Sequence, residues 1–138
     1  AASFVASSAP FAMPMGVAVA KNGDVYVANL TADAPGAGNI LIVSNGKASE
    51  FVSGFKLGYP AGIALDTGNT TLFTSALDST GHDQVVAVTL ATKATATFNT
   101  VIGQNTGGAG LHRASGKDIF SWADSPAYPS PRGPIIFK

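Results

Sequence analysis

The sequence predicts an all-β fold built from three repeats, each of which holds four short strands. Two observations carry this prediction: a motif recurs along the chain, and almost no segment has helical periodicity. The motif is a short apolar run, a polar turn with glycine, and a second run rich in β-branched and aromatic residues. It occupies residues 16–29, 62–76 and 110–124. This pattern is typical of β-hairpins.

Two further apolar runs follow the hairpins. The third runs are 40–43, 85–88 and 135–137, and the fourth runs are 48–52 and 94–98. The turns between third and fourth runs carry Asn45-Gly46 and Thr92-Lys93. Four strands in about 46 residues is the size of a β-propeller blade. A sandwich or a barrel also uses short strands, but neither accounts for a period of four strands with matching turns.

The predicted domain plan is a single partial propeller. A closing strand spans 1–9, and three blades span 10–54, 55–104 and 105–138. The last repeat lacks a fourth run, whereas Ala2–Ala6 is similar to Ser49–Ser53, so we expect the first strand to complete the last blade.

Rings usually have roughly four to eight blades. We therefore expect half of a six-bladed ring, in which two copies form a homodimer. The alternative is a piece of a longer protein that contains the missing blades.

Composition excludes several classes of partner. The formal net charge is zero, and only 12% of residues are charged, which argues against nucleic acid. No apolar run approaches the roughly 18 residues that span a bilayer. The chain has no cysteine, which excludes disulfides and thiolate catalysis. The low charge and the abundant Ala, Thr and Ser lead us to expect an exported, periplasmic or extracellular protein.

The repeated phrases at 16–29 and 60–75 resemble NHL-repeat propellers. They are also similar to the gluconolactonase and senescence-marker family and to virginiamycin B lyase. The resemblance implies a propeller whose function is that of a metal-dependent lactonase, a lyase or a binding domain. The lactonase pattern often has an asparagine before the first-strand glycine. Met15, Ala61 and Ala109 occupy those positions here, so the resemblance implies no such calcium ligand.

Loop lengths select one end of the blades for a site. The links 31–38, 78–83 and 125–133 are longer than the turns at the other end, and function tends to lie on long loops. We expect the site there, around the mouth of the channel. His112 stands where the other repeats have Ala18 and Ala64, so packing does not require a histidine. It is a candidate general base or metal ligand, or else a histidine hydrogen-bonded between blades.

Other candidates surround this position. Arg113 is suited to clamping a carboxylate or phosphate, or to an ion pair between blades. Asn29, Asp78 and Asp124, at the ends of equivalent second strands, join His112 in a candidate oxygen-rich site for calcium or magnesium. Capping of the next turn is the alternative. Trp122, aligned with Ala28 and Ser75, offers a stacking surface to a ligand or fills space between blades.

Two classes of function follow. The first is a binding or assembly platform that holds a small molecule, a protein, a glycan or another copy on the long-loop face. The second is a lactonase-like hydrolase or lyase, with His112 as general base and a divalent cation that polarises the carbonyl. Low charge and the absence of the channel asparagines favour the platform, whereas the departures at His112 and Arg113 favour the enzyme.

Overall fold

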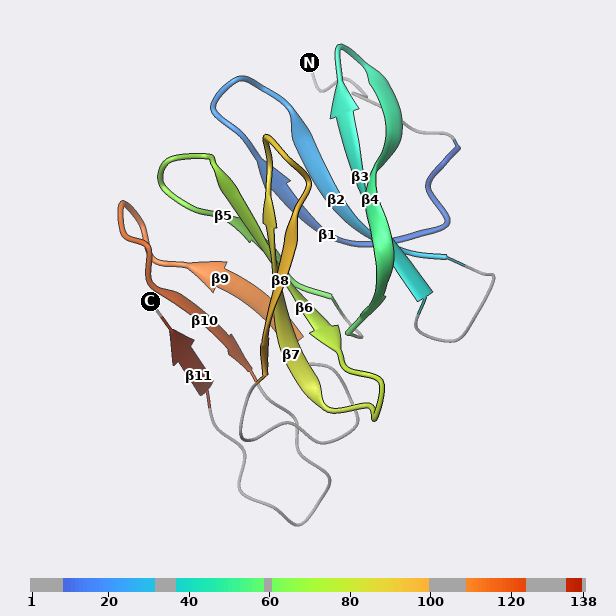
Figure 1. Ribbon diagram of the computed structural model, residues 1–138. Coiled ribbons are helices and arrows are strands. Elements are labelled where there is room, and N and C mark those ends of the chain that lie inside the picture. The colour runs from blue at the N-terminus through green and yellow to red at the C-terminus, as the bar shows by residue number, and fades with distance from the viewer. Residues whose placement is uncertain (1–8, 32–36, 59–60, 100–108, 124–133, 138) are drawn as a thin grey trace.

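A computed structural model describes residues 9–31, 37–58, 61–99, 109–123 and 134–137, and these residues form β-strands and turns (Figure 1). The strands fall into three antiparallel meanders. Blade 1 contains β1 (Met13–Val19), β2 (Val25–Leu30), β3 (Ala37–Ser44) and β4 (Lys47–Leu57). Blade 2 contains β5 (Ile63–Leu65), β6 (Thr71–Leu77), β7 (Asp83–Thr89) and β8 (Thr95–Asn99). Blade 3 contains β9 (Ala109–Arg113), β10 (Phe120–Ala123) and β11 (Pro134–Phe137).

This arrangement confirms the all-β repeat of four strands in blades 1 and 2 and shows three strands in the described part of blade 3. Each strand pairs antiparallel with the next one in its blade. Residues 1–8, the bulk of the predicted closing strand, lie outside the described residues. Within the described ranges, no helix is long and apolar enough to cross a membrane.

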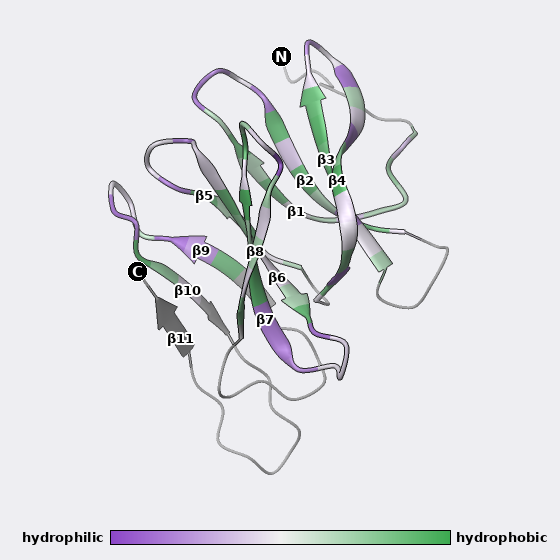
Figure 2. Ribbon diagram, viewed as in Figure 1, coloured by the Kyte–Doolittle hydropathy of each residue, from purple (hydrophilic) through white to green (hydrophobic). Residues whose placement is uncertain are grey.

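Short turns join the strands at one end of each blade. Asn45 and Gly46 both have positive φ, at 51° and 75°. These values are typical of the type I′ turn, whose twist matches that of a two-residue hairpin. Figure 2 shows hydrophilic residues at the turns between first and second strands, as expected of exposed hairpin ends.

Apolar side chains pack the blades face to face. Blade 2 lies between the others, because its first strand, β5, contacts both β1 and β9. A large cluster fills the seam between blades 1 and 2, and its members include Ala18, Tyr26, Ile63 and Leu72. A smaller cluster of Ala64, Val85, Leu111 and Phe120, with Phe73 packed against it, fills the seam between blades 2 and 3. The blades are therefore three layers with two apolar seams.

Hydrogen bonds join the short turns of successive blades. The amide of Lys21 donates to Asn69 Oδ1 at 2.8 Å, and Lys21 Nζ donates to the carbonyl of Thr67 at 2.8 Å. The amide and hydroxyl of Thr67 in turn donate to the two carboxylate oxygens of Asp118, at 2.6 and 2.8 Å. This series of hydrogen bonds thus links the turns of all three blades, with the turn of blade 2 in the middle.

The pairing register tests the alignment of the repeats. Ala18 pairs with Tyr26, Ala64 with Phe73, and His112 with Ser121. The seams between blades relate these pairs, because Leu111 faces the preceding blade as Ile63 does, so His112 follows Leu111 as Ala64 follows Ile63. The expected alignment of Trp122 with Ala28 and Ser75 is wrong by one residue. Since Ser121 matches Tyr26 and Phe73, Trp122 matches Val27 and Thr74, which follow them.

Candidate functional site

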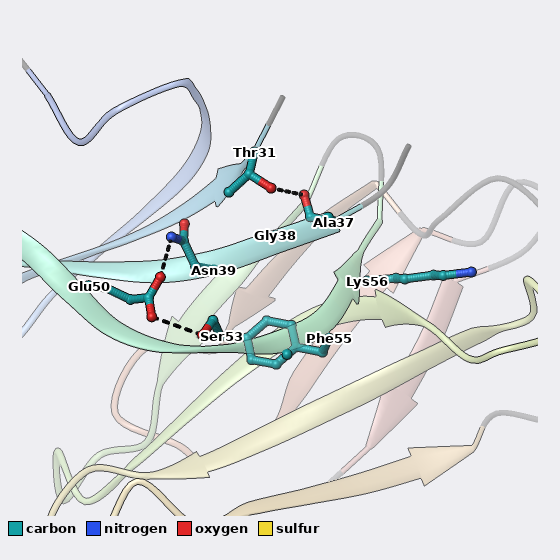
Figure 3. Close-up of a pocket in the computed structure, with 9 residues that line it drawn as sticks. Thr31, Ala37, Gly38, Asn39, Glu50, Ser53, Phe55 and Lys56 are labelled. Carbon is teal, nitrogen blue, oxygen red and sulfur yellow. Dashed lines mark hydrogen bonds between the residues drawn. The ribbon is translucent and has the colours of Figure 1, made fainter. Parts of the chain in front are cut away.

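Two adjoining hollows lie where the strands reach the predicted long-loop end. The first has a volume of about 440 Å³, and the second has a volume of about 410 Å³. They share the segment 53–56 of β4, which forms the ridge between them. The lining of the first is completed by Thr31, Ala37, Gly38, Asn39 and Glu50 (Figure 3). The lining of the second is completed by Leu77, Asp78, Ser79, Gln84, Val86, Thr95 and Thr97.

Bulges in β4 shape this ridge. The pairing with β3 slips once between Gly38 and Asn39 and again between Ile40 and Leu41. Each slip leaves one extra residue on β4, and one of these is Gly54, with a φ of 96°. A bulge bends a strand and changes the direction of its side chains, and glycine adopts this φ without steric cost.

The end of β4 is fixed by blade 2. Lys56 and Leu57 pair with Leu77 and Ala76 of β6, which joins the two blades into one sheet. Leu57 is buried in the main seam and lies against Gly38, where an added Cβ would come within 2.5 Å of the Leu57 side chain. The ridge is therefore held rigidly at its far end.

A line of polar side chains crosses blade 1 beside the first hollow. Asn29, which is fully buried, donates from Nδ2 to Asn39 Oδ1 at 2.9 Å. Asn39 Nδ2 donates to Glu50 Oε2 at 2.8 Å, and the Ser53 hydroxyl donates to Glu50 Oε1 at 2.9 Å. Figure 3 shows Asn39, Glu50 and Ser53 joined in this way, with the Phe55 ring beside Ser53 and the Lys56 side chain extended away from Glu50.

These bonds keep the Glu50 carboxylate ionised. The hydrogen bond from Asn39, followed by that from Ser53, lowers the pKa of Glu50 below its ordinary value. Each carboxylate oxygen accepts one of these bonds and keeps further acceptor capacity. Glu50 is exposed, so it presents a charged acceptor, already oriented by its neighbours, to any ligand in the first hollow.

Asp78 lines the second hollow and caps a turn. Its Oδ1 accepts bonds from the Thr80 hydroxyl at 2.6 Å, the Thr80 amide at 2.8 Å and the His82 amide at 2.9 Å. The Thr80 hydroxyl and the His82 amide are the main causes that lower the pKa of Asp78 to about 2. The turn-capping interpretation describes this geometry, and Asp78 also lines a hollow on the expected end of the blades.

The other predicted residues lie apart from these hollows. His112 is exposed on β9. The Arg113 guanidinium lies over its own turn and donates to the carbonyls of Ala114 and Lys117 at 3.2 and 3.0 Å. Trp122 lies on β10, opposite Ile135. Asp124 lies outside the described residues. Within the described part of the chain, neither hollow is lined by His112 or Arg113.

The hollows lie at the predicted end of the blades, but they do not lie beside the predicted strands. They lie against the fourth strand, β4, whereas the expected position was the channel mouth beside the first strands. The sequence prediction missed Glu50, Phe55, Lys56, Gln84 and the threonines of β8. One signal for them was present: Gly54 interrupts an otherwise strand-like run, which is typical of a bulge.

The structure describes only some of the residues of the predicted cation site, since Asp124 is not among them. Both polar atoms of the Asn29 amide are engaged, since its Oδ1 accepts from the amides of Ala12 and Met13 at 2.9 and 3.1 Å and its Nδ2 donates to Asn39. Among the described residues, no three His, Cys, Asp or Glu side chains are grouped closely enough to hold a metal ion. A site that includes Asp124 stays a prediction.

Comparison with known proteins bears on the fold. No protein-family model matches the chain, and no curated protein sequence matches it. Solved structures do: hydrazine synthase of Kuenenia stuttgartiensis aligns with a TM-score of 0.66 at 13% identity, over 89% of this chain and 33% of that one. A Thermus thermophilus protein described as a putative oxidoreductase (glucose dehydrogenase) aligns with a TM-score of 0.62 at 13% identity, over 87% of this chain and 39% of that one. This chain therefore spans between a third and two fifths of their lengths, and it has the fold of part of a β-propeller.

Proposed function

We propose that this chain is a β-propeller binding platform, and that the pair of hollows on either side of residues 53–56 holds a neutral ligand rich in hydroxyl groups, such as a glycan. The observation that carries the proposal is the lining. Hydroxyl, amide and carboxylate groups surround one half-buried aromatic ring, Phe55.

The chemistry of the lining matches a sugar ring. A hexose presents hydroxyls that both donate and accept, together with an apolar face of C–H groups. Glu50 and Asp78 accept bonds, Thr95 and Thr97 do both, and Gln84 donates and accepts. The Phe55 ring supplies the apolar surface on the ridge between the two hollows. A ligand that crosses the ridge would contact both.

Titration with cellohexaose, a neutral hexose oligosaccharide, tests the proposal. We expect saturable binding by calorimetry, with chemical-shift changes confined to residues that line the two hollows. Phe55→Ala should weaken binding about tenfold, which corresponds to ~1.4 kcal/mol. Glu50→Gln keeps the shape of the side chain but removes its charge, and it should weaken binding severalfold. This second variant keeps the test valid if Phe55→Ala disturbs the packing between the blades.

Phe98→Ala is the matched control, because Phe98 is an exposed aromatic residue on β8 that is not among the described lining of either hollow. It should leave binding unchanged. Binding that Phe55→Ala and Glu50→Gln do not weaken would contradict the proposed site. Absence of binding to cellohexaose and to chitohexaose would contradict the neutral-glycan class.

A lactonase-like hydrolase or lyase is the second candidate, because His112 departs from the repeat and is exposed. In that function His112 is the general base, Arg113 holds an anionic group, and calcium or magnesium assists. Hydrolysis of a δ-lactone that is lost in a folded His112→Ala variant would favour it.

We also propose a relationship to NHL-repeat or gluconolactonase-type propellers, which the repeated phrases support. Export from the cytoplasm is a further part of the proposal, which the low charge supports.

A further inference from the structure

We propose that the first hollow binds the acetamido group of an N-acetylhexosamine, so that the platform prefers oligomers of N-acetylated amino sugars to oligomers of plain hexoses. The inference rests on the proposed function, since it names the class of glycan that the same site selects. Three features of the first hollow carry it: the polarity of its free hydrogen-bonding groups, the position of one aromatic ring and the balance of its charges.

The two hydroxyl groups that line the first hollow have already donated their protons. The Thr31 hydroxyl donates to the carbonyl of Ala37 at 3.2 Å, and the Ser53 hydroxyl donates to Glu50 Oε1 at 2.9 Å. A carbonyl and an ionised carboxylate have no proton to give, so the direction of both bonds is fixed. Thr31, Ser53 and Glu50 therefore offer a ligand only acceptor capacity.

Two side chains of the same hollow can still donate. Among the described residues that line it, these are Asn39, which has one N–H beyond its bond to Glu50, and Lys56. Figure 3 shows the Lys56 side chain extended away from Glu50. A secondary amide suits this arrangement, because its N–H donates one bond and its nitrogen, unlike a hydroxyl oxygen, brings no lone pair that would face the acceptors. The ligand group next to Glu50 should therefore be an N–H and not an O–H.

The Phe55 ring offers an apolar surface beside the hydrogen-bonded pair of Glu50 and Ser53 (Figure 3). The ring is half-buried and packs against the main core cluster, so its position is fixed. Its partner across the strands is Gly38, so β3 places no side chain opposite the ring. An acetamido group joins an N–H to a methyl group through one carbonyl carbon. It can therefore meet the carboxylate with its N–H and the ring with its methyl group.

The charges around the first hollow favour a neutral group over an ammonium group. Glu50 and Lys56 line the hollow with one charge of each sign. A second cation, Lys93 in the turn between β7 and β8, acts on the Glu50 carboxylate, and its Nζ lies 5.1 Å from the centroid of the Phe51 ring. A free amino sugar would add a third positive charge to this group, whereas an acetamido group adds none. The N-acetylated sugar should therefore bind better than the free amine.

Calorimetric titration with three oligosaccharides of equal length tests the proposal. They are chitohexaose, which is N-acetylated, the glucosamine hexamer, which carries free amines, and cellohexaose, which carries neither group. We expect chitohexaose to bind at least about tenfold more tightly than each of the other two, because its acetamido group satisfies Glu50 and also covers the Phe55 ring. In NMR spectra of the complex, nuclear Overhauser effects should join the ligand methyl groups to the Phe55 ring.

Glu50→Gln puts an NH2 group in place of one acceptor oxygen. It should remove the preference, so that chitohexaose and cellohexaose bind with affinities within about twofold of each other. Glu50 is exposed, so the variant should fold, and an unfolding curve checks this. Phe98→Ala is the matched control, an exposed aromatic residue outside the described lining of the hollow, and it should leave the preference unchanged.

The three ligands separate this inference from the proposed function. Cellohexaose that binds as tightly as chitohexaose would overturn the acetamido site and leave the glycan platform standing. Tighter binding of the glucosamine hexamer would overturn it too, and would show that the Glu50 charge selects a cation. Bound chitohexaose whose methyl groups do not contact Phe55 would place the acetamido group elsewhere and overturn the assignment. Binding of none of the three would contradict both this inference and the proposed function.

Discussion

Asn29 shows how one buried side chain fastens the entry to blade 1. Its Oδ1 accepts bonds from the amides of Ala12 and Met13, while its Nδ2 supports Asn39 beside the first hollow. Removal of the amide leaves two backbone donors and one side-chain acceptor without their partner.

We therefore predict that Asn29→Ala lowers the free energy of unfolding by about 2 kcal/mol. Asn22→Ala is the control, because Asn22 is exposed and its side chain bonds only to the nearby, half-buried Asp24, so its effect should stay within about 0.5 kcal/mol. Urea unfolding measures both. Equal losses in the two variants would show that the Asn29 bonds do not stabilise the fold.

Asp78 gives a prediction of pH dependence at the same scale. Its pKa is about 2 in the folded protein against an ordinary value of 3.8, mainly because of the Thr80 hydroxyl. As the pH falls from about 4 to about 2, the unfolded chain takes up a proton that the folded chain does not, so stability is lost. Glu50 has a pKa lowered in the same direction and contributes to the same loss.

Asp78→Asn should therefore flatten the acid limb of a plot of unfolding free energy against pH between about 4 and 2. Above a pH of about 6 the difference between wild type and variant should be constant. NMR titration of the Asp78 side chain provides the direct check. A midpoint near the ordinary aspartate value would refute the turn-capping account.

At the scale of the elements, close packing between blades 1 and 2 explains why the first strand has a glycine at position 16. A Cβ added at Gly16 would lie 2.6 Å from the backbone oxygen of Ala61 and 3.1 Å from Ile63 Cγ2. The first strands of blades 1 and 2 approach too closely for any other residue. Because the obstacle is backbone, the blades themselves must separate to relieve it.

Gly16→Ala is accordingly expected to destabilise the fold by about 2 kcal/mol or more. Gly68→Ala is the matched control, since its nearest contact would be an ordinary 3.5 Å to the Thr70 side chain. Thermal unfolding of the two variants compares them. A Gly16→Ala variant as stable as the Gly68→Ala variant would mean that the seam tolerates wider spacing.

Individual strands and turns show which parts of the fold could be predicted from the sequence. Repeated local patterns, such as the hairpins and the Asn45-Gly46 turn, depend on neighbours along the chain, and the strands were found in the predicted order. The β4 ridge was missed because its form depends on two bulges and on the pairing of Lys56 with Leu77 in the next blade. The alignment of Trp122 was wrong by one residue because the turn of the third hairpin is one residue longer than that of the first: His112 pairs with Ser121, nine residues later, whereas Ala18 pairs with Tyr26, eight residues later.

At the scale of the whole molecule, the repeat defines a direction of stacking. Each blade offers one face with Val17, Ile63 or Leu111 and an opposite face with Ala18, Ala64 or His112. The internal seams join a residue of the first set to the preceding member of the second. The identity of these positions was predictable from the sequence, whereas the seam that each of them enters follows only from the three-dimensional stack.

This order of blades is the central claim, and a crosslink within one chain tests it most directly. The chain has no cysteine, so pairs of thiols can be introduced without background reaction. Thr67→Cys with Asp118→Cys places one thiol on each side of the contact between blades 2 and 3. Lys21→Cys with Asp118→Cys is the matched control, because Lys21 lies on blade 1 and contacts the turn of blade 2. After treatment of the folded variants with a short bismaleimide, the account predicts a crosslink within the chain for the first pair and little for the second. Equal crosslinking of the two pairs, or none in the first, would contradict the claim that blade 2 lies between blades 1 and 3.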